Sequence, residues 1–575
     1  MRKLLKYLKP YRKECVISPL FKLLEAIFDL LVPLVVRDII DNGVTRGGGY
    51  VTGRFGILIA FAIIGLACAL VAQYYAAKAA VGFSTGLRRD LFSHIQGFSY
   101  AQTDRIGTST LITRMTADVN QLQSGVNMTL RLFLRSPIIV FGAVIMGFAV
   151  NPRSALVFVL IIPLLAVVVF GIMIKSIPLY RKVQKNLDGV TSSTRETLAG
   201  VRVIRAFRKE NEEIRHFDEI NEAHYRVQNT VGKLNALMNP LTLLLVNLGT
   251  ILLIYSGANI VNVGGMTQGE VVAMINYMAQ VLVELVKFAS TIFLVNKALV
   301  CADRVGSVFD IPTGMETLEH SEFSGNADDA VAFSGASLTY EGNADASLSD
   351  ITFTAKKGST VGIIGSTGSG KTSAINLIPR FYDVTKGAVL VNGRDVRTYD
   401  TQKLRDMIAI VPQKAILFRG TIRSNLLWGN ANATDEELWN ALALAQAKEF
   451  VEQKEGGLDA PVEAGGKNFS GGQRQRLTIA RALVKKAEIL ILDDSASALD
   501  YATDAALRAA LRTLPNSPTV FIISQRTSSI RHADSILVLE DGAAVGIGTH
   551  DSLLKSCEVY KEIYESQFGK AGENA

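Results

Sequence analysis

A glycine-rich run past the middle of the chain has the residue types and spacing that bind phosphate. It consists of Gly365, Ser366, Thr367, Gly368, Ser369, Gly370, Lys371 and Thr372, with Ser373 directly after it. An apolar run precedes it and a helix-compatible segment follows, so the order is strand, glycine loop, helix. Backbone N–H groups and the helix dipole can surround phosphate oxygens, and Lys371 adds a positive charge for the β- and γ-phosphates. The Thr372 hydroxyl can coordinate Mg²⁺, so this stretch predicts a nucleotide site.

Further polar residues stand where such a site can use them. Gln413 follows a short apolar strand, so its amide can reach Mg²⁺ or an attacking water. Asp493 ends the apolar strand Ile489 to Leu492, and its carboxylate is a typical ligand for Mg²⁺. We therefore expect Thr372, Gln413 and Asp493 to hold the metal. Tyr340, upstream of the loop, can stack on adenine, although an aromatic residue in a strand is as often part of a core.

A second helix start in the same half of the chain is also suited to bind an anion. Ser470, Gly471, Gly472 and Gln473 follow Phe469 and open a segment that reads as a helix from Arg474 to Val484. The first N–H groups of a helix lack partners within it and carry the positive end of its dipole. The chain therefore has two predicted anion sites.

Composition predicts a membrane-embedded first half. A chain of 575 residues is too long for one core, 49% of it is hydrophobic, and the long apolar runs lie before about residue 300. The net charge of +7 comes from basic residues beside these runs rather than in one patch, which favours the positive-inside rule over a nucleic-acid partner. The scattered cysteines fit neither a metal spacing nor a disulfide framework; they are Cys15, Cys68, Cys301 and Cys557.

Six segments approach the roughly 20 apolar residues that a spanning helix needs. They are Val16 to Ile40, Phe55 to Ala80, Ser136 to Val150, Ser154 to Ile174, Pro240 to Ile260 and Gly269 to Leu294. Short links follow the first, third and fifth, whereas long basic segments with helical periodicity follow the second and fourth. The long loops and both termini are therefore expected to be cytoplasmic. The basic segment Met1 to Lys13 is expected to form a helix at the membrane surface.

Two features of this half concern its contact with the second half and its polar residues within the membrane. The long loops are expected to turn back near Thr103 to Thr110 and Arg208 to His216, and to contact the second half of the chain there. Polar residues also share one helical face within two spans: Lys22, Glu25 and Asp29 in the first, and Asn276, Gln280, Glu284, Lys287 and Thr291 in the sixth. Such residues are costly in a membrane, so they indicate a water-filled pathway, an ion pair such as Glu284 with Lys287, or both.

Taken together, the chain resembles the ATP-binding cassette (ABC) transporters of the exporter type. The most specific evidence is the order of the phosphate loop, the signature Ser470 to Gln473 and the strand that ends at Asp493. The resemblance implies a membrane all-α domain, with six transmembrane helices and long cytoplasmic extensions, fused to a soluble α/β P-loop nucleotide-binding domain. The corresponding boundaries are 1–310, a linker at 311–328, and 329–575. It also implies ATP and Mg²⁺, and an inner or plasma membrane location.

The same resemblance implies a partner, because two cassettes pair head to tail in this family. Each ATP then lies between one chain's phosphate loop and the other chain's signature. A chain with one cassette would thus be a half-transporter that needs a second chain.

Two positions depart from the family pattern. In this family the residue after the Asp that ends this strand is usually Glu, which acts as the general base. This chain has Asp494 there, whose side chain is one methylene shorter. A misplacement of a catalytic group by about 1 Å can lower a rate roughly 10²-fold. At the position of the family's switch His, this chain has Gln525. A Gln can hydrogen-bond a γ-phosphate but cannot carry a proton or a positive charge. We therefore expect Asp494 and Gln525 to occupy the catalytic positions of a degenerate, slow site. The signature would complete a competent site on a different subunit; a homodimer with two slow sites is the alternative.

The expected function is ATP-driven export of a small-molecule, lipid or peptide cargo, with the cargo itself left open. An ATP-gated channel or membrane regulator, and an importer built on the same fold, remain alternatives because fold alone does not determine function.

Overall fold

The computed structural model describes residues 2–495 and 499–569 and divides into two compact units. The first unit holds the chain up to Gln96 together with Thr108–Pro312, and the second holds Gly97–Gly107 together with the chain from Thr313 onward. The expected membrane segment 1–310 is therefore not continuous, because a short piece of it packs with the second unit.

The chain is held on both sides of its last crossing between the units. In the first unit, Nε2 of His94 lies 3.0 Å from the carbonyl oxygen of Ile311. In the second unit, the N–H of Gly314 donates to the carbonyl of Gly97 at 2.7 Å. Only two residues, Pro312 and Thr313, separate these anchored positions.

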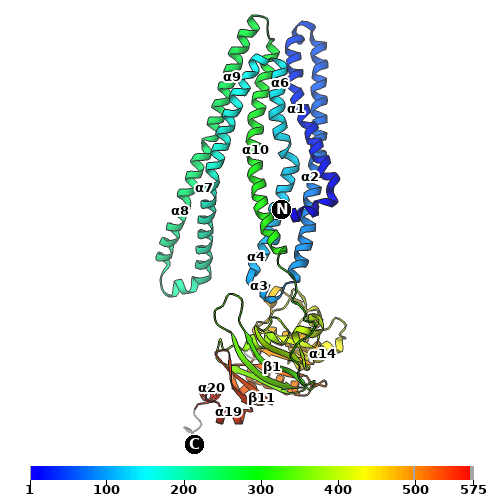
Figure 1. Cartoon of the computed structure of the whole chain (residues 1–575), viewed down its shortest axis with the longest axis vertical. Helices are drawn as coiled ribbons and strands as arrows, with labels where there is room; N and C mark the ends of the chain where they lie inside the picture. Colours follow the sequence, from blue (N-terminus) through cyan, green and yellow to red (C-terminus); the bar gives the residue numbers. More distant parts are fainter. Residues whose placement is uncertain (1, 496–498, 570–575) are drawn as a thin grey trace. The chain divides into compact units, whose positions relative to one another are not determined.

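The first unit consists of long helices (Figure 1). They are α1 (Arg12–Arg46), α2 (Gly48–Gln96), α4 (Thr108–Thr113), α5 (Val119–Met128), α6 (Arg135–Val150), α7 (Pro152–Ala206), α8 (Glu210–Ala236), α9 (Met238–Asn262) and α10 (Gln268–Phe309). Two π-helical turns, Arg114–Asp118 and Thr129–Phe133, join α4, α5 and α6 into one run. The basic N-terminal segment forms a 3₁₀ helix, Arg2–Tyr11.

Within the described residues, five helical stretches are long and apolar enough to cross a membrane. They are Gly48–Gln96, Thr108–Val150, Pro152–Ala206, Glu210–Asn262 and Gln268–Phe309, and they contain the second to sixth predicted spans. The first predicted span lies in α1, whose 35 residues are long enough, but Lys22, Glu25 and Asp29 interrupt its apolar sequence. Hydropathy therefore supports five of the six predicted spans.

Close packing and hydrogen bonds hold α1 among these helices. The Ser18 hydroxyl donates to the carbonyl of Ala72 in α2 at 2.9 Å, and the Tyr277 hydroxyl of α10 donates to the carbonyl of Leu30 at 2.7 Å. A Cβ atom on Gly142 of α6 would lie 2.4 Å from a methyl carbon of Leu30. Small residues permit such close approach where lipid offers no hydrophobic gain.

The short segment of the second unit that comes from the first half is the helix α3 (Tyr100–Ile106). Ser99 caps it, and the ring of Tyr100 stacks on Phe381 with centroids 4.2 Å apart. The Tyr382 hydroxyl donates to the carboxylate of Asp104. The predicted contact of the first turn-back segment is thus confirmed as far as Gly107. The second turn lies between α7 and α8, and its contact stays a prediction.

Two sheets organise the rest of the second unit. A four-stranded sheet has the order β2 (Leu348–Lys356), β1 (Asp329–Leu338), β4 (Lys386–Val391), β5 (Arg394–Asp395). A six-stranded sheet has the order β12 (Ala543–Gly548), β11 (Ser535–Glu540), β3 (Thr360–Gly365), β10 (Thr519–Ile523), β9 (Ile489–Asp493), β6 (Ile408–Val411). Only β12 is antiparallel in the larger sheet. Strand β9, between β10 and β6, is buried throughout, as expected for a parallel strand covered on both faces.

Helices and one short strand pair complete this unit. The helices are α11 (Lys371–Leu377), α12 (Thr401–Asp406), α13 (Ile422–Leu426), α14 (Asp435–Leu444), α15 (Lys448–Glu452), α16 (Gly471–Val484), α17 (Tyr501–Arg512), α18 (Thr527–Ile530), α19 (His550–Ser556) and α20 (Glu558–Phe568). The strand pair is β7 (Gly420–Thr421) with β8 (Pro461–Val462).

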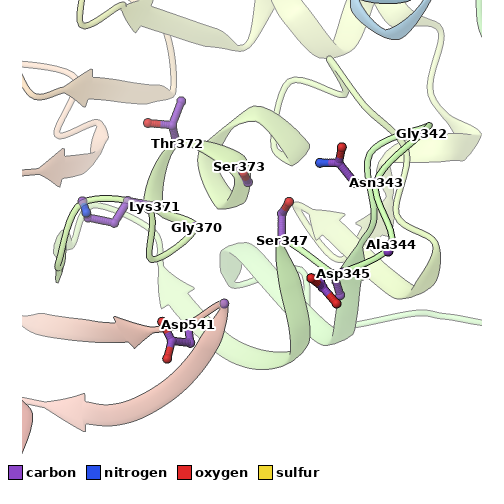
Figure 2. Close-up of a pocket in the computed structure, with 13 residues that line it drawn as sticks. Gly342, Asn343, Ala344, Asp345, Ser347, Gly370, Lys371, Thr372, Ser373 and Asp541 are labelled. Atoms are coloured by element: carbon purple, nitrogen blue, oxygen red, sulfur yellow. The ribbon is translucent and has the colours of Figure 1, made fainter.

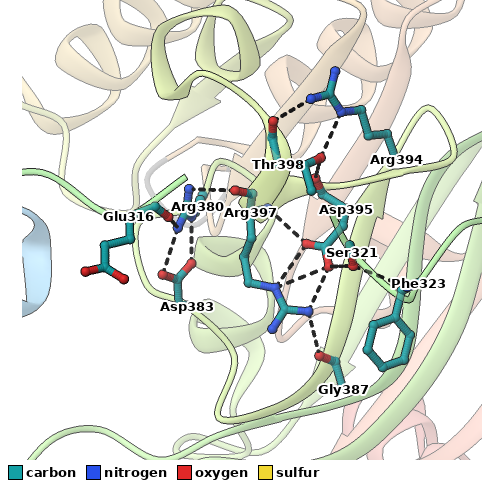
Figure 3. Close-up of polar contacts among 10 residues, drawn as sticks. All are labelled: Glu316, Ser321, Phe323, Arg380, Asp383, Gly387, Arg394, Asp395, Arg397 and Thr398. Carbon is teal, nitrogen blue, oxygen red and sulfur yellow. Dashed lines mark hydrogen bonds and ion pairs between the residues drawn. The ribbon is translucent and has the colours of Figure 1, made fainter. Parts of the chain in front are cut away.

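Hydrogen bonds fasten the expected linker to the second unit (Figure 3). Arg380, only 1% exposed, donates from Nη2 to the carbonyl of Glu316 at 2.6 Å and from Nε to Asp383 at 2.7 Å. The Ser321 hydroxyl donates to the buried carboxylate of Asp395 at 2.6 Å. Burial raises the pKa of Asp395, but hydrogen bonds from Arg397 and Ser321 outweigh it and lower the pKa. The linker therefore follows a fixed path.

Replacing Arg380 with Leu should loosen the attachment of the linker to the second unit. Loss of the guanidinium removes the charged donor of the hydrogen bonds to the carbonyls of Glu316 and Arg397, and such bonds contribute about 1.5–3 kcal/mol. We expect a lower unfolding temperature for the full-length chain and faster proteolysis within residues 313–328. Arg419→Leu, at an exposed arginine, should change neither. Unchanged cleavage of the Arg380 variant would show that the hydrogen bonds do not hold the linker.

Candidate functional site

The carboxyl ends of four adjacent parallel strands meet around one small cavity. Strands β3, β10, β9 and β6 lie side by side in this order. The cavity, of about 130 Å³, is lined by Thr367, Gly368, Lys371, Thr372, Gln413, Asp493, Asp494, Ile523, Ser524 and Gln525. Ligands of open α/β sheets bind at this edge. The fold thus brings together the phosphate loop and the polar residues predicted to act with it.

Two glycines of the phosphate loop are required by its geometry. Gly370 has φ +93°, and a Cβ there would lie 2.6 Å from the carbonyl oxygen of Ser347. A Cβ on Gly365 would lie 2.1 Å from the carbonyl oxygen of Leu539. A larger side chain at either position would displace backbone, so these residues determine how closely the loop packs.

Lys371 begins α11 with its ammonium group folded over the loop. Its Nζ donates to the carbonyl of Gly365 at 2.9 Å and to the hydroxyl of Ser369 at 3.3 Å. Burial lowers the pKa of Lys371, while the carboxylates of Asp494 and Asp493 act in the opposite direction. A buried cation thus lies beside both acids and beside the N-terminus of a helix.

The two acids after β9 differ in their surroundings. Asp493, 6% exposed, accepts a hydrogen bond from the Thr372 hydroxyl, and burial together with Asp494 raises its pKa to about 6. Asp494 has φ +45°, a region in which Asp is more common than longer side chains. Its N–H donates to the carbonyl of Ile523 at 3.0 Å, and Nε2 of Gln413 lies 3.4 Å from its Oδ2. Asp494 is therefore held near Gln413.

These side chains fit Mg²⁺ that is shared with a phosphate. The Thr372 hydroxyl, the Gln413 amide oxygen and the Asp493 carboxylate are hard oxygen donors around one cavity. Mg²⁺ is usually bound by one or two carboxylates plus substrate phosphates and water. Among the described residues no group of three or more His, Cys, Asp or Glu side chains could hold a metal by itself. The donors therefore suit a metal that arrives with its nucleotide.

A larger cavity adjoins the first and shares Gly368, Lys371 and Thr372 with it. It measures about 670 Å³ and lies between the phosphate loop, the turn from Gly342 to Ser347, and Asp541 (Figure 2). Sequence reasoning missed both added walls. The Gly-Asn and Asp-Gly pairs that form them are turn signals, but only the fold brings these turns to the loop.

Tyr340 stands beside the phosphate loop rather than in the core alone. Its hydroxyl donates to the Ser373 hydroxyl at 3.0 Å, and its ring meets Tyr382 edge to face at 4.9 Å. It is partly buried against the hydrophobic core. Tyr340 thus packs partly against the core, and its stacking on adenine stays a prediction.

The signature residues form a capped helix start elsewhere on the unit. The Ser470 hydroxyl accepts from the N–H of Gln473 at 3.3 Å, and Oε1 of Gln473 accepts from the N–H of Ser470 at 3.1 Å. Ser470 and Gly471 are exposed, whereas Gly472 and Gln473 are partly exposed. Among the described residues, neither cavity at the phosphate loop includes any of the four. Within one chain the two predicted anion sites thus remain separate.

Comparison with known proteins agrees with this architecture. The ABC transporter transmembrane region family matches residues 15–285, and the ABC transporter family matches residues 348–497. An uncharacterized ABC transporter ATP-binding protein of Mycobacterium tuberculosis is 38% identical over 568 residues, covering 98% of this chain and 97% of its own. YfiB of Bacillus subtilis, also an uncharacterized ABC transporter ATP-binding protein, is 35% identical over 576 residues, covering 100% of both chains.

A solved structure shows the same fold. A bacterial Atm1-family ABC exporter with ATP bound matches with a TM-score of 0.80 and 22% identity, over 98% of this chain and 99% of the other. The fold class and the family predicted from the motifs are confirmed. This chain belongs to the ABC transporters, as an exporter-type half-transporter that fuses a membrane-spanning domain to a nucleotide-binding domain.

Proposed function

We propose that this chain is one subunit of a heterodimeric ATP-driven exporter, and that its own phosphate-loop site binds ATP but hydrolyses it slowly. The observation that carries the proposal is the small cavity at the strand ends, which Asp494 and Gln525 line together with Lys371 and Asp493. The family pattern has Glu and His at the positions of Asp494 and Gln525. Both substitutions thus fall in one pocket, where they affect the same reaction.

The binding part of this site is complete. Gly365 to Ser373 and Tyr340 bind the nucleotide, and Thr372, Gln413 and Asp493 hold Mg²⁺. When bound, the metal neutralises charge on the phosphate oxygens. The shorter carboxylate of Asp494 lies near Gln413 and reaches less far toward an attacking water, and neutral Gln525 cannot exchange a proton with the phosphate. This site is therefore expected to bind ATP tightly and to hydrolyse it slowly.

The competent site belongs to the pair of chains. The N-terminus of α16 at Ser470 is exposed and suited to an anion, but it is separate from this chain's phosphate loop. We propose that Ser470 to Gln473 contact ATP on a different subunit that carries the missing Glu and His. Basic residues in the long helical extensions of α2 and α7 support a cytoplasmic location for both termini.

The composition of the complex tests the proposal directly. Purification from the native host, through a tag on this chain, should yield a native mass for two chains of similar size. Peptide identification should show a second ABC half-transporter with Glu and His at the two positions. A complex of this chain alone would overturn the heterodimer.

Restoring both residues should accelerate the slow site. We expect Asp494→Glu combined with Gln525→His to raise ATP turnover of the purified complex, by up to about 10²-fold at this site if carboxylate position limits the rate. The matched control, Asp435→Glu with Gln402→His at exposed positions, should not change turnover. No gain in the first variant would contradict the role given to these two residues.

The raised pKa of Asp493 gives a pH prediction. Its pKa is about 6 in the folded chain and 3.8 ordinarily, so the folded state binds this proton more tightly than the unfolded state. At pH values above 6 the ionised carboxylate therefore lowers the free energy of unfolding by at most about 3 kcal/mol. This destabilisation decreases as the pH falls and is absent below about pH 4. Asp493→Asn should raise the unfolding temperature of the nucleotide-free protein at pH 7.5, with a gain that shrinks toward pH 5.

The same substitution should remove the Mg²⁺ dependence of ATP binding. Asp328→Asn, at an exposed position, should alter neither property. A gain in stability that is the same at pH 7.5 and pH 5 would contradict the assigned titration.

A further inference from the structure

The loop that carries Gln525 lies between β10 and α18 and forms part of the wall of the small cavity. On the β10 side, the N–H of Ser524 donates to the carbonyl of Ile363 in β3 at 3.1 Å. The N–H of Arg526 donates to the Ser524 hydroxyl at 2.9 Å. These bonds fasten the first residue of the loop to the sheet and leave the carbonyl of Gln525 and the N–H of Thr527 for other partners.

Gln567 of α20 supplies those partners with one amide group. Its Oε1 accepts from the N–H and from the hydroxyl of Thr527, both at 2.9 Å. Its Nε2 donates to the carbonyl of Gln525 at 2.7 Å. Thr527 begins α18, and the first N–H groups of a helix lack partners within it. Gln567 therefore holds the loop on both sides of Arg526.

The helix that carries Gln567 is itself fixed by buried contacts. The hydroxyl of Tyr560, a fully buried residue of α20, lies 2.8 Å from Nδ1 of His550 in α19. Tyr560 also belongs to the core cluster that contains Ile530 of α18 and Ile536 of β11. Residues seven positions apart lie on the same face of a helix, so Gln567 shares the face of Tyr560. The core thus determines where the amide of Gln567 stands.

The position of Gln567 indicates an indirect role. Gln567 is exposed and, within the described residues, belongs to neither cavity at the phosphate loop. Gln525 is also exposed, and it lines the small cavity together with Lys371 and Asp493. The backbone conformation of a residue determines which rotamers its side chain can adopt. Gln567 can therefore affect a bound nucleotide through the backbone of Gln525 rather than by direct contact.

We propose that Gln567 is a positioning residue of the nucleotide site, which directs the side chain of Gln525 toward the γ-phosphate by holding the loop that carries it. The Gln525 amide can donate a hydrogen bond to a phosphate oxygen. ADP lacks the γ-phosphate, so Gln567 contributes to the preference of this site for ATP over ADP. The inference rests on the proposed function, because that function assigns Gln525 to the γ-phosphate.

Nucleotide binding measured on this chain alone tests the role of Gln567. The purified complex in lipid nanodiscs is photolabelled with radioactive 8-azido-ADP, and the label is counted on this chain after its isolation under denaturing conditions. Displacement by ADP and by the non-hydrolysable β,γ-imido-ATP, each with Mg²⁺, gives the ratio of the two affinities. We expect Gln567→Met to lower the preference for the triphosphate about tenfold, the lower end for a hydrogen bond to a charged group, with unchanged ADP affinity.

A double-mutant cycle separates positioning from a merely structural role. Gln525→Ala should lower the same preference about tenfold, because it removes the donor to the γ-phosphate. Adding Gln567→Met to Gln525→Ala should cause no further loss, because the side chain that Gln567 positions is then absent. Gln453→Met, at an exposed position outside both cavities, is the matched control and should behave like the wild type.

A second substitution decides the case if Gln567→Met does not fold. Gln567→Glu keeps the size and the acceptor for Thr527 but removes the donor to the carbonyl of Gln525, so it should also lower the preference for the triphosphate. An unchanged preference in the variant that folds would overturn the proposal. Equal losses of ADP and triphosphate affinity, or additive losses in the double variant, would overturn it as well.

The outcomes also separate this inference from the proposed function. Faster turnover in Asp494→Glu with Gln525→His, together with an unchanged preference in Gln567→Met, would remove only the inference. A lowered preference in a complex that contains only this chain would retain the role of Gln567 and remove the heterodimer.

Discussion

The nucleotide site depends on one constraint, the parallel order of neighbouring strands. Parallel strands all end at the same edge of their sheet, so β3, β10, β9 and β6 deliver Lys371, Gln525, Asp493 and Gln413 to one place although the chain separates them widely. Each parallel connection needs a crossover through other elements. The surrounding helices, including α11 and α16, are those crossovers, and they supply the two helix starts that suit anions.

Buried charge is handled in opposite ways in the two units. In the membrane-spanning unit, Arg135 is matched by several carboxylates, so its charge is largely compensated before any ligand arrives. In the nucleotide-binding unit, Asp493 and Asp494 lie together, and burial and the charge of Asp494 raise the pKa of Asp493 although Lys371 acts in the opposite direction. The first arrangement holds helices together. The second is a site whose electrostatics favour the arrival of a metal.

The sequence predicted the parts of the molecule that local patterns determine. The phosphate loop, the strand before Asp493 and the start of α16 are each contiguous in the chain, so their local structure could be predicted from the sequence. The cavity walls at Gly342 to Ser347 and Asp541 could not, because only the strand order brings these turns to the loop. Arg135 was missed as a partner of Asp29 and Glu284 because they lie 106 and 149 residues away. Hydropathy counts the charged residues of α1 as a cost, because their partners lie far away in the sequence, and it therefore does not identify α1 as a span.

The anchored crossing between the units has a mechanical consequence. Ile311 is held by His94 on one side and Gly314 by Gly97 on the other, so only Pro312 and Thr313 connect these two anchored residues. Three residue steps reach at most about 11 Å, and proline restricts the backbone of the first of the two connecting residues. The chain also crosses between the units on either side of Gly97–Gly107. Two units joined by a single flexible connection could rotate about it independently. Three short chain connections restrict such rotation, so a rotation of one unit is passed to the other as well as a displacement.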